Sequence, residues 1–284
     1  MHKMLKKYFP VFALPTLAAF IISFVVPFIT GVYLSFTEFR VVNNSKWVGL
    51  ENYIKIFTTD KTFLDSLRLT VKFTVVSVIT INLIAFTLAM LLTKGLRGTN
   101  FFRTVFFMPN LIGGIVLGHI WSLIINGVLG LFGVDITYNP DYGFWGLVIL
   151  MNWQLIGYMM IIYIAGIQNI PEHLNESAAI DGASPLQTLF HVTIPMVMPS
   201  VTICTFLTLT NSFKLFDQNL ALNGKAPETA LLSLDIYKTF YDHTGLKLAQ
   251  WHGIGQAKAV IFFLIVALIA FVQLRATRQR EVDD

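Results

Sequence analysis

Long apolar segments alternate with short polar ones along almost the whole chain. The charged residues gather between the apolar segments and leave stretches of about 20 residues, which is the length an α-helix needs to cross a hydrocarbon core roughly 30 Å thick. The pattern predicts an all-α, polytopic membrane protein in which residues 1–284 form a single transmembrane domain. Six membrane-spanning helices are predicted, at residues 11–35, 71–92, 105–125, 145–168, 196–222 and 254–274.

The first segment follows three lysines and could be taken for a signal peptide. A signal peptide has an apolar region of only about 7–15 residues that ends at a small-residue cleavage site. This segment continues through Phe24, Pro27, Phe28 and Tyr33. We therefore expect an uncleaved membrane span.

An even number of spans places both termini on the same side of the membrane, and basic flanks indicate which side. The loops on the opposite side hold most of the acidic residues, for example Glu38, Glu51, Asp60 and Asp65. We therefore expect a multi-pass protein of the cell membrane with cytoplasmic N- and C-termini. The basic residues on the predicted cytoplasmic side are Lys3, Lys6, Lys7, Lys94, Arg97, Arg103, Arg275, Arg278 and Arg280.

Two of the predicted outer loops contain apolar residues among their charges. One covers residues 36–68 and includes Trp47 and Tyr53, and the other covers 223–253 and includes Leu234 and Phe240. Such composition is typical of short helices that lie at a membrane interface or pack over the spans.

The composition agrees with a membrane protein. Hydrophobic residues make up 55% and charged residues 13%, and the mean hydropathy is +0.67, whereas soluble domains carry roughly a quarter charged residues. The net charge of +4 comes mainly from basic segments beside the spans, so no nucleic-acid partner is expected. Cys204, the single cysteine, lies in an apolar stretch, and we expect neither a disulfide nor a metal site.

The predicted cytoplasmic loop at residues 169–195 contains two short helices joined by a turn. Pro171 suits the first turn of a helix and Gly182 its C-terminal end, while Ser184 and Pro185 form an N-cap and first-turn pair that begins the second helix. Pro195 is expected to end it. The first helix would expose apolar residues in the cytoplasm, so a partner protein is expected to cover it, although an amphipathic linker on the membrane surface would serve equally.

The sequence of this loop, NESAAIDGASPLQTLFHVTIP, resembles the EAA loop of permeases from ATP-binding-cassette importers, with Ser177 in place of the first alanine. Other stretches resemble the sugar-type permeases of maltose, oligosaccharide and glycerol-phosphate importers: WVGLENYIKIF, GTNFFRTVFFMPNLI, GHIWSLIIN, YIAGIQNIP and NSFKLFD. The resemblance covers nearly the whole chain. It implies the MetI-like permease fold with six spans, short interfacial helices outside and a cytoplasmic coupling helix.

The resemblance also implies the function and the partners. Such a permease forms half of a translocation path for a carbohydrate and pairs with a second, related permease as a heterodimer. It docks on two cytoplasmic ATPase subunits and receives its sugar from an extracellular or periplasmic solute-binding protein. The residues that the resemblance assigns to contact with the ATPase are Glu176, Ala178, Ala179, Asp181, Gly182 and Ala183.

The chain itself is not expected to be an enzyme. It lacks the G-x-x-x-x-G-K-[ST] phosphate loop, so we expect no catalytic residue and no cofactor in it, with ATP and Mg bound by the partner ATPase.

Polar residues within the fifth predicted span are candidates for the substrate path, because polar side chains inside a membrane are costly. On a continuous helix, one stripe flanked by Phe213 and Phe216 contains the polar residues Thr210, Asn211, Lys214, Asp217 and Gln218. Of these, Asn211, Lys214 and Asp217 are included in the predicted path. Lys214 and Asp217 are three residues apart and are expected to pair; they could instead reach the interface or brace neighbouring helices. Amides beside aromatic rings suit a sugar.

The third and fourth predicted spans contribute further polar residues. Gln154 and Tyr158 of the fourth span are included in the predicted path, while Asn82 of the second span is expected to bond to a neighbouring helix. Other residues could line the same cavity, but pattern alone does not select them: His119, Trp121, Asn126, Asn152 and Trp153.

Two other classes of protein compete with this interpretation. An ion-coupled secondary sugar transporter needs buried carboxylates or broken helices, and only Asp217 qualifies. A membrane-embedded enzyme needs a catalytic cluster, and the sequence offers no such set. The ATP-binding-cassette permease is therefore the favoured interpretation.

Overall fold

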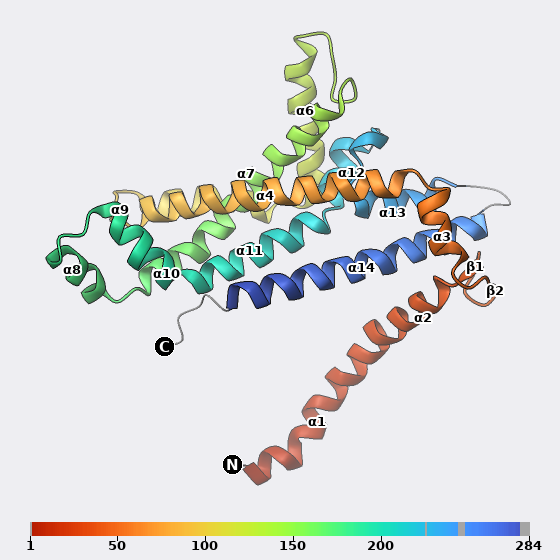
Figure 1. Cartoon of the computed structure of the whole chain (residues 1–284), viewed down its shortest axis with the longest axis horizontal. Coiled ribbons are helices and arrows are strands. Elements are labelled where there is room, and N and C mark those ends of the chain that lie inside the picture. The colour runs from red at the N-terminus through yellow and green to blue at the C-terminus, as the bar shows by residue number, and fades with distance from the viewer. Residues whose placement is uncertain (1, 225, 244–247, 279–284) are drawn as a thin grey trace. The chain divides into compact units, whose positions relative to one another are not determined.

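The structure is a computed structural model that describes residues 2–224, 226–243 and 248–278 (Figure 1). Helices dominate it, which confirms the predicted all-α fold, and its two strands contain three residues each. Arg280, one of the basic residues used above to orient the chain, lies outside the described residues.

The helices and strands follow one another along the chain, with η denoting short 3₁₀- and π-helical segments. In order they are α1 His2–Phe20, η1 Ile21–Val25, α2 Val26–Leu34, β1 Thr37–Phe39, β2 Ser45–Trp47, α3 Glu51–Thr58, α4 Thr62–Leu92, α5 Thr99–Phe107, η2 Met108–Leu111, α6 Gly114–Gly130, α7 Pro140–Gln168, α8 Glu172–Ile180, α9 Pro185–Thr188, η3 Leu189–Thr193, α10 Ile194–Met196, α11 Met198–Phe213, α12 Asp217–Asn223, η4 Pro227–Thr229, α13 Leu232–Tyr241 and α14 Leu248–Arg278.

By length and composition, four helices in the described part of the chain can each cross a membrane alone. They are Ala13–Leu34, Thr62–Leu92, Pro140–Gln168 and Leu248–Gln273. Two bent pairs raise the number to six if each pair counts as one span. The four continuous helices overlap the segments expected at 11–35, 71–92, 145–168 and 254–274.

The helix expected at 105–125 is not continuous. Thr99–Leu111 and Gly114–Gly130 meet at an angle of 101°. Ile112 and Gly113 between them have extended backbone, with ψ of 130° and 140°. Apolar periodicity continues through this break, which is why the pattern alone predicted one helix.

The helix expected at 196–222 is broken twice. Pro185–Met196 and Met198–Phe213 meet at 70°, so the helix breaks at Val197 rather than at Pro195. Pro199 fits there because the first turn of α11 needs no donor from it. The second break follows Phe213, and a new helix begins at Asp217.

The chain divides into two compact units, each built from segments far apart in the sequence. The first comprises residues 1–63 and 236–264, and the second comprises residues 64–235 and 265–284.

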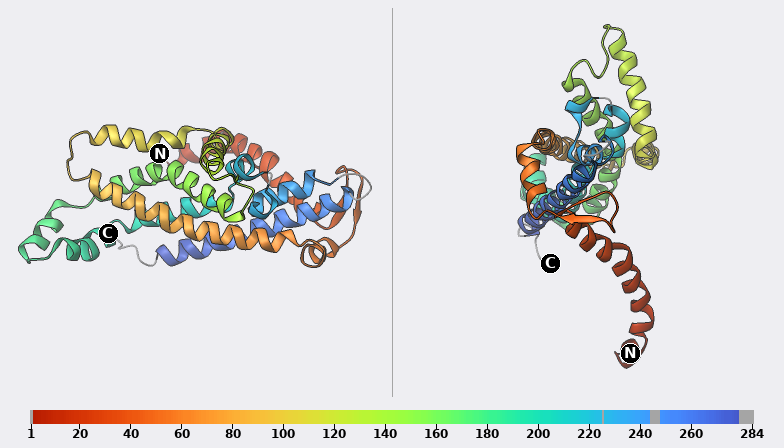
Figure 2. Two further views of the ribbon diagram at one scale, coloured as in Figure 1. Left: turned by 90° about the horizontal axis from the view of Figure 1, so that it is seen from above. Right: turned by 90° about the vertical axis from the view of Figure 1, so that its right-hand side faces the viewer.

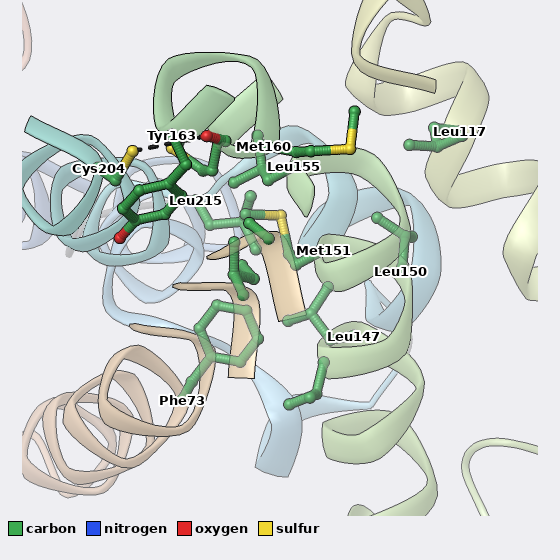
Figure 3. Close-up of a cluster of buried hydrophobic side chains, with 14 of the residues drawn as sticks. Phe73, Leu117, Leu147, Leu150, Met151, Leu155, Met160, Tyr163, Cys204 and Leu215 are labelled. Atoms are coloured by element: carbon green, nitrogen blue, oxygen red, sulfur yellow. Dashed lines mark hydrogen bonds between the residues drawn. The ribbon is translucent and has the colours of Figure 1, made fainter. Parts of the chain in front are cut away.

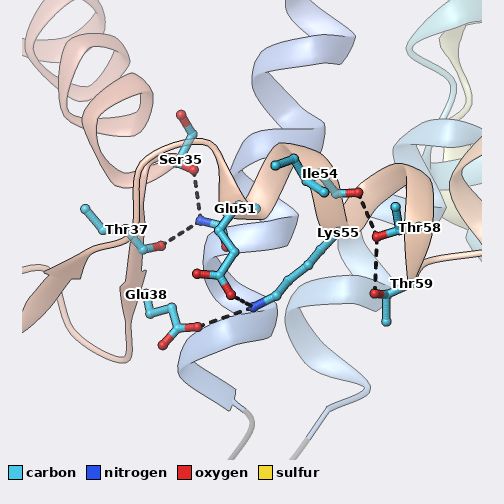
Figure 4. Close-up of polar contacts among 9 residues, drawn as sticks. Ser35, Thr37, Glu38, Glu51, Ile54, Lys55, Thr58 and Thr59 are labelled. Carbon is cyan, nitrogen blue, oxygen red and sulfur yellow. Dashed lines mark hydrogen bonds and ion pairs between the residues drawn. The ribbon is translucent and has the colours of Figure 1, made fainter.

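The first unit contains a short hairpin and a helix held by polar contacts (Figure 4). β1 and β2 pair antiparallel, with Thr37 opposite Trp47. The buried Asn52 amide of α3 donates to the carbonyl oxygens of Ser35 and Thr37, each at 2.9 Å. Lys55 pairs with Glu51 at 2.6 Å. α3 is the short helix predicted within 36–68, whereas the hairpin was not predicted because its strands are too short for an alternating pattern.

A buried ion pair joins α14 to the turn before α4 in the same unit. Lys258 Nζ lies 2.5 Å from Asp60 Oδ2, and the two side chains are 0% and 4% exposed. Lys258 also donates to Thr239 Oγ1 at 2.8 Å. Burial raises the pKa of Asp60, but the hydrogen bond and charge of Lys258 and the bonds from Thr62 lower it more, and the net shift is downward.

We expect Lys258→Met to destabilise the protein by about 3–5 kcal/mol, because it leaves the Asp60 carboxylate buried without its cation. The temperature of unfolding in detergent micelles measures this loss. Arg68→Met, which removes an ion pair to Asp65 with both side chains more than three-quarters exposed, is the matched control and should cost less than about 1 kcal/mol. Equal effects of the two variants would contradict the assignment.

The ion pair also predicts a pH dependence. Because the pKa of Asp60 is lowered on folding, its stabilisation is present above the ordinary carboxyl pKa of about 4 and is lost as the pH falls through the lowered value. The double variant Asp60→Asn, Lys258→Met should recover stability relative to Lys258→Met and lose this acid sensitivity.

The second unit has a hydrophobic core around α7 (Figure 3). Within it, the Tyr163 hydroxyl donates to Asn82 Oδ1 at 2.8 Å, and the Asn82 amide donates to Thr208 Oγ1 at 3.3 Å. Asn82 thus bonds to neighbouring helices, as predicted. Cys204 is buried beside Tyr163 and donates to the carbonyl of Met159 at 3.7 Å.

α5 packs along α7 in this unit (Figure 2). Gly157 of α7 permits the contact, because a Cβ on it would lie 1.8 Å from the carbonyl oxygen of Phe106. Small residues let helix backbones approach closely in membranes.

Candidate functional site: a central pocket and the EAA loop

The EAA loop folds as a helix, a glycine turn and a second helix, as predicted. α8 ends in a Schellman motif: the Gly182 amide donates to the carbonyl of Ala179, and the Ala183 amide donates to that of Ala178. Gly182 has φ of +75°, the left-handed conformation that favours glycine. Ser184 then caps α9 in a capping box with Gln187.

The loop presents its predicted contact residues outward. Glu176, Ala179, Asp181 and Gly182 are exposed, and Ala178 and Ala183 are half-buried. Large apolar side chains are also uncovered beside them: Ile180 is 85% exposed, Leu186 68% and Phe190 62%. An apolar surface of this kind is typical of an interaction site.

The second unit contains a cavity of about 350 Å³, here called the central pocket. Its lining includes six of the seven predicted path residues. Its full lining is Asn110, Met151, Gln154, Leu155, Tyr158, Asn211, Lys214, Leu215, Phe216, Asp217 and Gln218.

The break between α11 and α12 shapes this pocket. α11 ends at Phe213, Lys214 follows with φ of −92° and ψ of 14°, and α12 begins at Asp217. The prediction that these residues form one stripe on an unbroken helix is therefore wrong, although most of them line the same cavity. Lys214 and Asp217 are exposed to the pocket, and Asn211 and Phe216 are half-buried.

Two details of the predicted path are corrected. Phe213 is only 2% exposed and does not line the pocket, because two residues along a helix are about 200° apart and Asn211 faces the pocket. Lys214 and Asp217 form no ion pair with each other in the described part of the chain, since the helix that would set their spacing ends between them.

The sequence analysis missed Asn110, and it did not include Gln218 among the predicted substrate-path residues. The Gln218 amide donates to Gln154 Oε1 at 2.8 Å, and the Gln154 amide reaches the carbonyl of Ile112 at 3.4 Å. These bonds tie α12 and α7 to the break before α6. The proline before Asn110 was the available signal, because it marks a helix interruption.

The other polar residues of the third and fourth predicted spans do not join the central pocket. His119 and Asn126 line a different cavity. Trp121 packs edge-on against Trp153, with ring centroids 5.8 Å apart. Within the described residues there is no group of three or more His, Cys, Asp or Glu side chains that could hold a metal ion.

Comparison with known proteins identifies the family. Residues 82–280 match the family described as "Binding-protein-dependent transport system inner membrane component". The chain belongs to this family: it is a multi-pass membrane permease subunit of a binding-protein-dependent ATP-binding-cassette transport system. The predicted resemblance is thereby confirmed.

Relatives in this family align over nearly the whole chain. The protein described as "Probable starch degradation products transport system permease protein AmyD" from Thermoanaerobacterium thermosulfurigenes is 43% identical, over 96% of this chain and 94% of its own length. An arabinooligosaccharide transport system permease, AraP from Halalkalibacterium halodurans, is 30% identical over 92% and 86%. A trehalose/maltose transport system permease, MalF from Thermococcus litoralis, is 27% identical over 94% and 92%.

Solved structures share the fold. A chain of a bacterial transporter that imports the polysaccharide alginate matches with a TM-score of 0.78 at 20% identity, covering 98% of each chain. A chain of the MetNI methionine transporter matches with a TM-score of 0.59 at 17% identity, covering 79% of this chain and 99% of its own. The predicted MetI-like permease fold is confirmed.

Proposed function

We propose that this chain forms half of a translocation path for a carbohydrate and couples that path to a separate ATPase. The central pocket carries the proposal, because it gathers amides, a tyrosine and a phenylalanine in one cavity between the helix breaks. Amides can bond to sugar hydroxyls while aromatic faces cover the C–H surfaces of the ring. The names of the relatives, which refer to starch products, arabino-oligosaccharides and trehalose or maltose, support a sugar as the substrate.

The EAA loop is the proposed docking site for the ATPase, with Glu176 and the turn at Gly182 in its centre. Its uncovered apolar side chains give the ATPase a surface to bind. The loop leads through α9, η3 and α10 into α11, whose last turn contributes Asn211 to the central pocket. A displacement of the loop would therefore reach the pocket along consecutive helical segments that bend by 70° at Val197.

The remaining partners follow from this role. Half of a path needs a second permease, and we propose a related chain in a heterodimer, two cytoplasmic ATPase subunits that bind ATP and Mg, and an extracellular or periplasmic binding protein that delivers the sugar. Because the ATPase subunits are cytoplasmic, we propose that the EAA loop and both termini lie in the cytoplasm. The chain itself then has no catalytic residue and no cofactor.

The proposal is tested by reconstituting the components in liposomes. We expect radiolabelled maltose or longer malto-oligosaccharides to enter only when this chain, the second permease and ATPase of the same genome, the binding protein and ATP are all present. The chain alone should not hydrolyse ATP. Uptake by the lone chain under a proton or sodium gradient would instead support an ion-coupled transporter with Asp217 as its carboxylate.

A further inference from the structure

A second cavity in the same unit has no role in the function described so far. It measures about 420 Å³ and lies between α6, the segment before α7 and α12. We call it the second pocket; its polar lining consists of His119, Ser122, Asn126, Asp135, Thr137 and Asn223. Cavities of about 300–1,000 Å³ are typical of small-molecule sites.

The wall of the second pocket is built by hydrogen bonds. Asn126 Oδ1 accepts from the amide of Ile136 at 2.9 Å, which ties the segment before α7 to α6. Asp135 Oδ1 accepts from the amide of Thr137 at 2.8 Å. Hydroxyl, amide, imidazole and carboxylate groups thus surround a fixed space, and together they can donate to and accept from the hydroxyls of a sugar.

Asn223 adds an unsatisfied polar group. Its side chain is 2% exposed, and its amide donates to the carbonyl of Gly143 at 3.1 Å. Its Oδ1 is buried and has no hydrogen-bond partner among the described residues. This oxygen lies against Gly143, where an added Cβ would come within 3.0 Å of it, so Asn223 holds the start of α7 against this wall of the pocket.

The second pocket lies one short helix away from the central pocket. α12 begins at Asp217 in the central pocket and ends at Asn223 in the second pocket, a rise of about 9 Å. α6 runs beside α12: a Cβ on Gly118 would lie 2.7 Å from that of Ala221. The two pockets therefore share α12 as a wall, and α6 lines the second pocket beside it.

The order of contacts along α7 places the second pocket on the side away from the EAA loop. Gly143, near the start of α7, meets Asn223 of the second pocket, and Gln154 lines the central pocket. The far end of α7 leads at Ile170 into the EAA loop. If the EAA loop faces the ATPase, the second pocket faces the binding protein.

We propose that the second pocket is a further sugar subsite, which holds one ring of an oligosaccharide while another ring lies in the central pocket. This inference rests on the proposed function. It implies that long substrates depend on the second pocket, whereas a disaccharide held in the central pocket does not.

The test compares maltose with maltoheptaose in the reconstituted complete transporter. Two variants alter the pocket: His119→Ala removes a hydrogen-bonding group, and Ser122→Phe fills the space. Each should lower the uptake rate of maltoheptaose relative to maltose by about three- to tenfold, the effect of losing one or two net hydrogen bonds. Ile120→Ala and Leu123→Phe, on the exposed face of α6, are the matched controls and should leave this ratio unchanged.

The outcomes separate the two proposals. Equal losses for both sugars would assign His119 and Ser122 to helix packing, and unchanged ratios would show that no sugar contacts the pocket; either result overturns the subsite. Wild-type transporter that takes up none of the sugars would count against the carbohydrate substrate itself, before any variant is compared. Should Ser122→Phe fail to assemble, His119→Ala alone decides the question.

Discussion

Gly182→Val is expected to abolish ATP-driven uptake while the protein still inserts into the membrane. Gly182 has φ of +75°, and a residue with a Cβ reaches this region at a cost of about 1–2 kcal/mol, with a β-branched residue at the upper end. Apart from its chain neighbours, nothing lies within 4 Å of a Cβ built at this position, so the effect comes from the backbone conformation alone. The strained turn should unwind and misdirect α8.

The control for this prediction is Gly182→Asn. Asparagine tolerates the left-handed conformation better than other residues with a Cβ, so this variant should keep most of the uptake. The measurements are ATP-driven uptake and the amount of ATPase that co-purifies with the permease. Normal uptake by Gly182→Val would refute the role assigned to the turn.

Glu176→Ala examines the other part of the same loop. Glu176 is exposed on α8, and we propose that it meets a polar or basic group of the ATPase. Leaving such a group buried without its mate costs on the order of 2–5 kcal/mol, so ATPase retention and uptake should both fall. Glu172→Ala removes an exposed carboxylate from the first turn of the same helix and should have a much smaller effect. Equal losses would mean that overall charge, not this position, governs docking.

Gly157→Ala is expected to destabilise the protein strongly. The added Cβ would lie 1.8 Å from the carbonyl oxygen of Phe106 and 2.7 Å from the amide nitrogen of Phe107. Both are backbone atoms, so no side-chain rotation relieves the clash and α5 must move away from α7. The cost should reach or exceed the upper end of the about 1–3 kcal/mol usual for overpacking.

The measurement for Gly157→Ala is the yield of folded protein and its unfolding temperature in detergent. The matched control is Gly127→Ala, also within a helix, where a Cβ would contact nothing within 4 Å. Alanine has the higher helix propensity, so this control should be neutral or slightly stabilising. A Gly157→Ala variant with wild-type stability would contradict the packing of α5 on α7. Because Tyr158 follows Gly157 and lines the central pocket, uptake should fall together with stability.

The sequence by itself determined the features that depend on nearby residues. Runs of apolar residues fixed which segments are long enough to span a membrane, because the length of a helix is set by its own residues. The turn of the EAA loop was equally local: Gly182 ends α8 and Ser184 caps α9 through bonds to residues within a few positions. These features needed no knowledge of the rest of the chain.

Only the tertiary structure decided where the predicted spans break and which polar residues share a cavity. The break at 112–113 lies in apolar sequence and the break at 214–216 begins at a lysine. The segments on either side are held by distant partners, with Gln154 of α7 bonded to Gln218 and close to the carbonyl of Ile112. Once α11 ends at Phe213, that side chain packs in the core, and Lys214 and Asp217 separate. Periodicity assumes an unbroken helix, so it could group these residues but could not show that His119 and Asn126 line a cavity of their own.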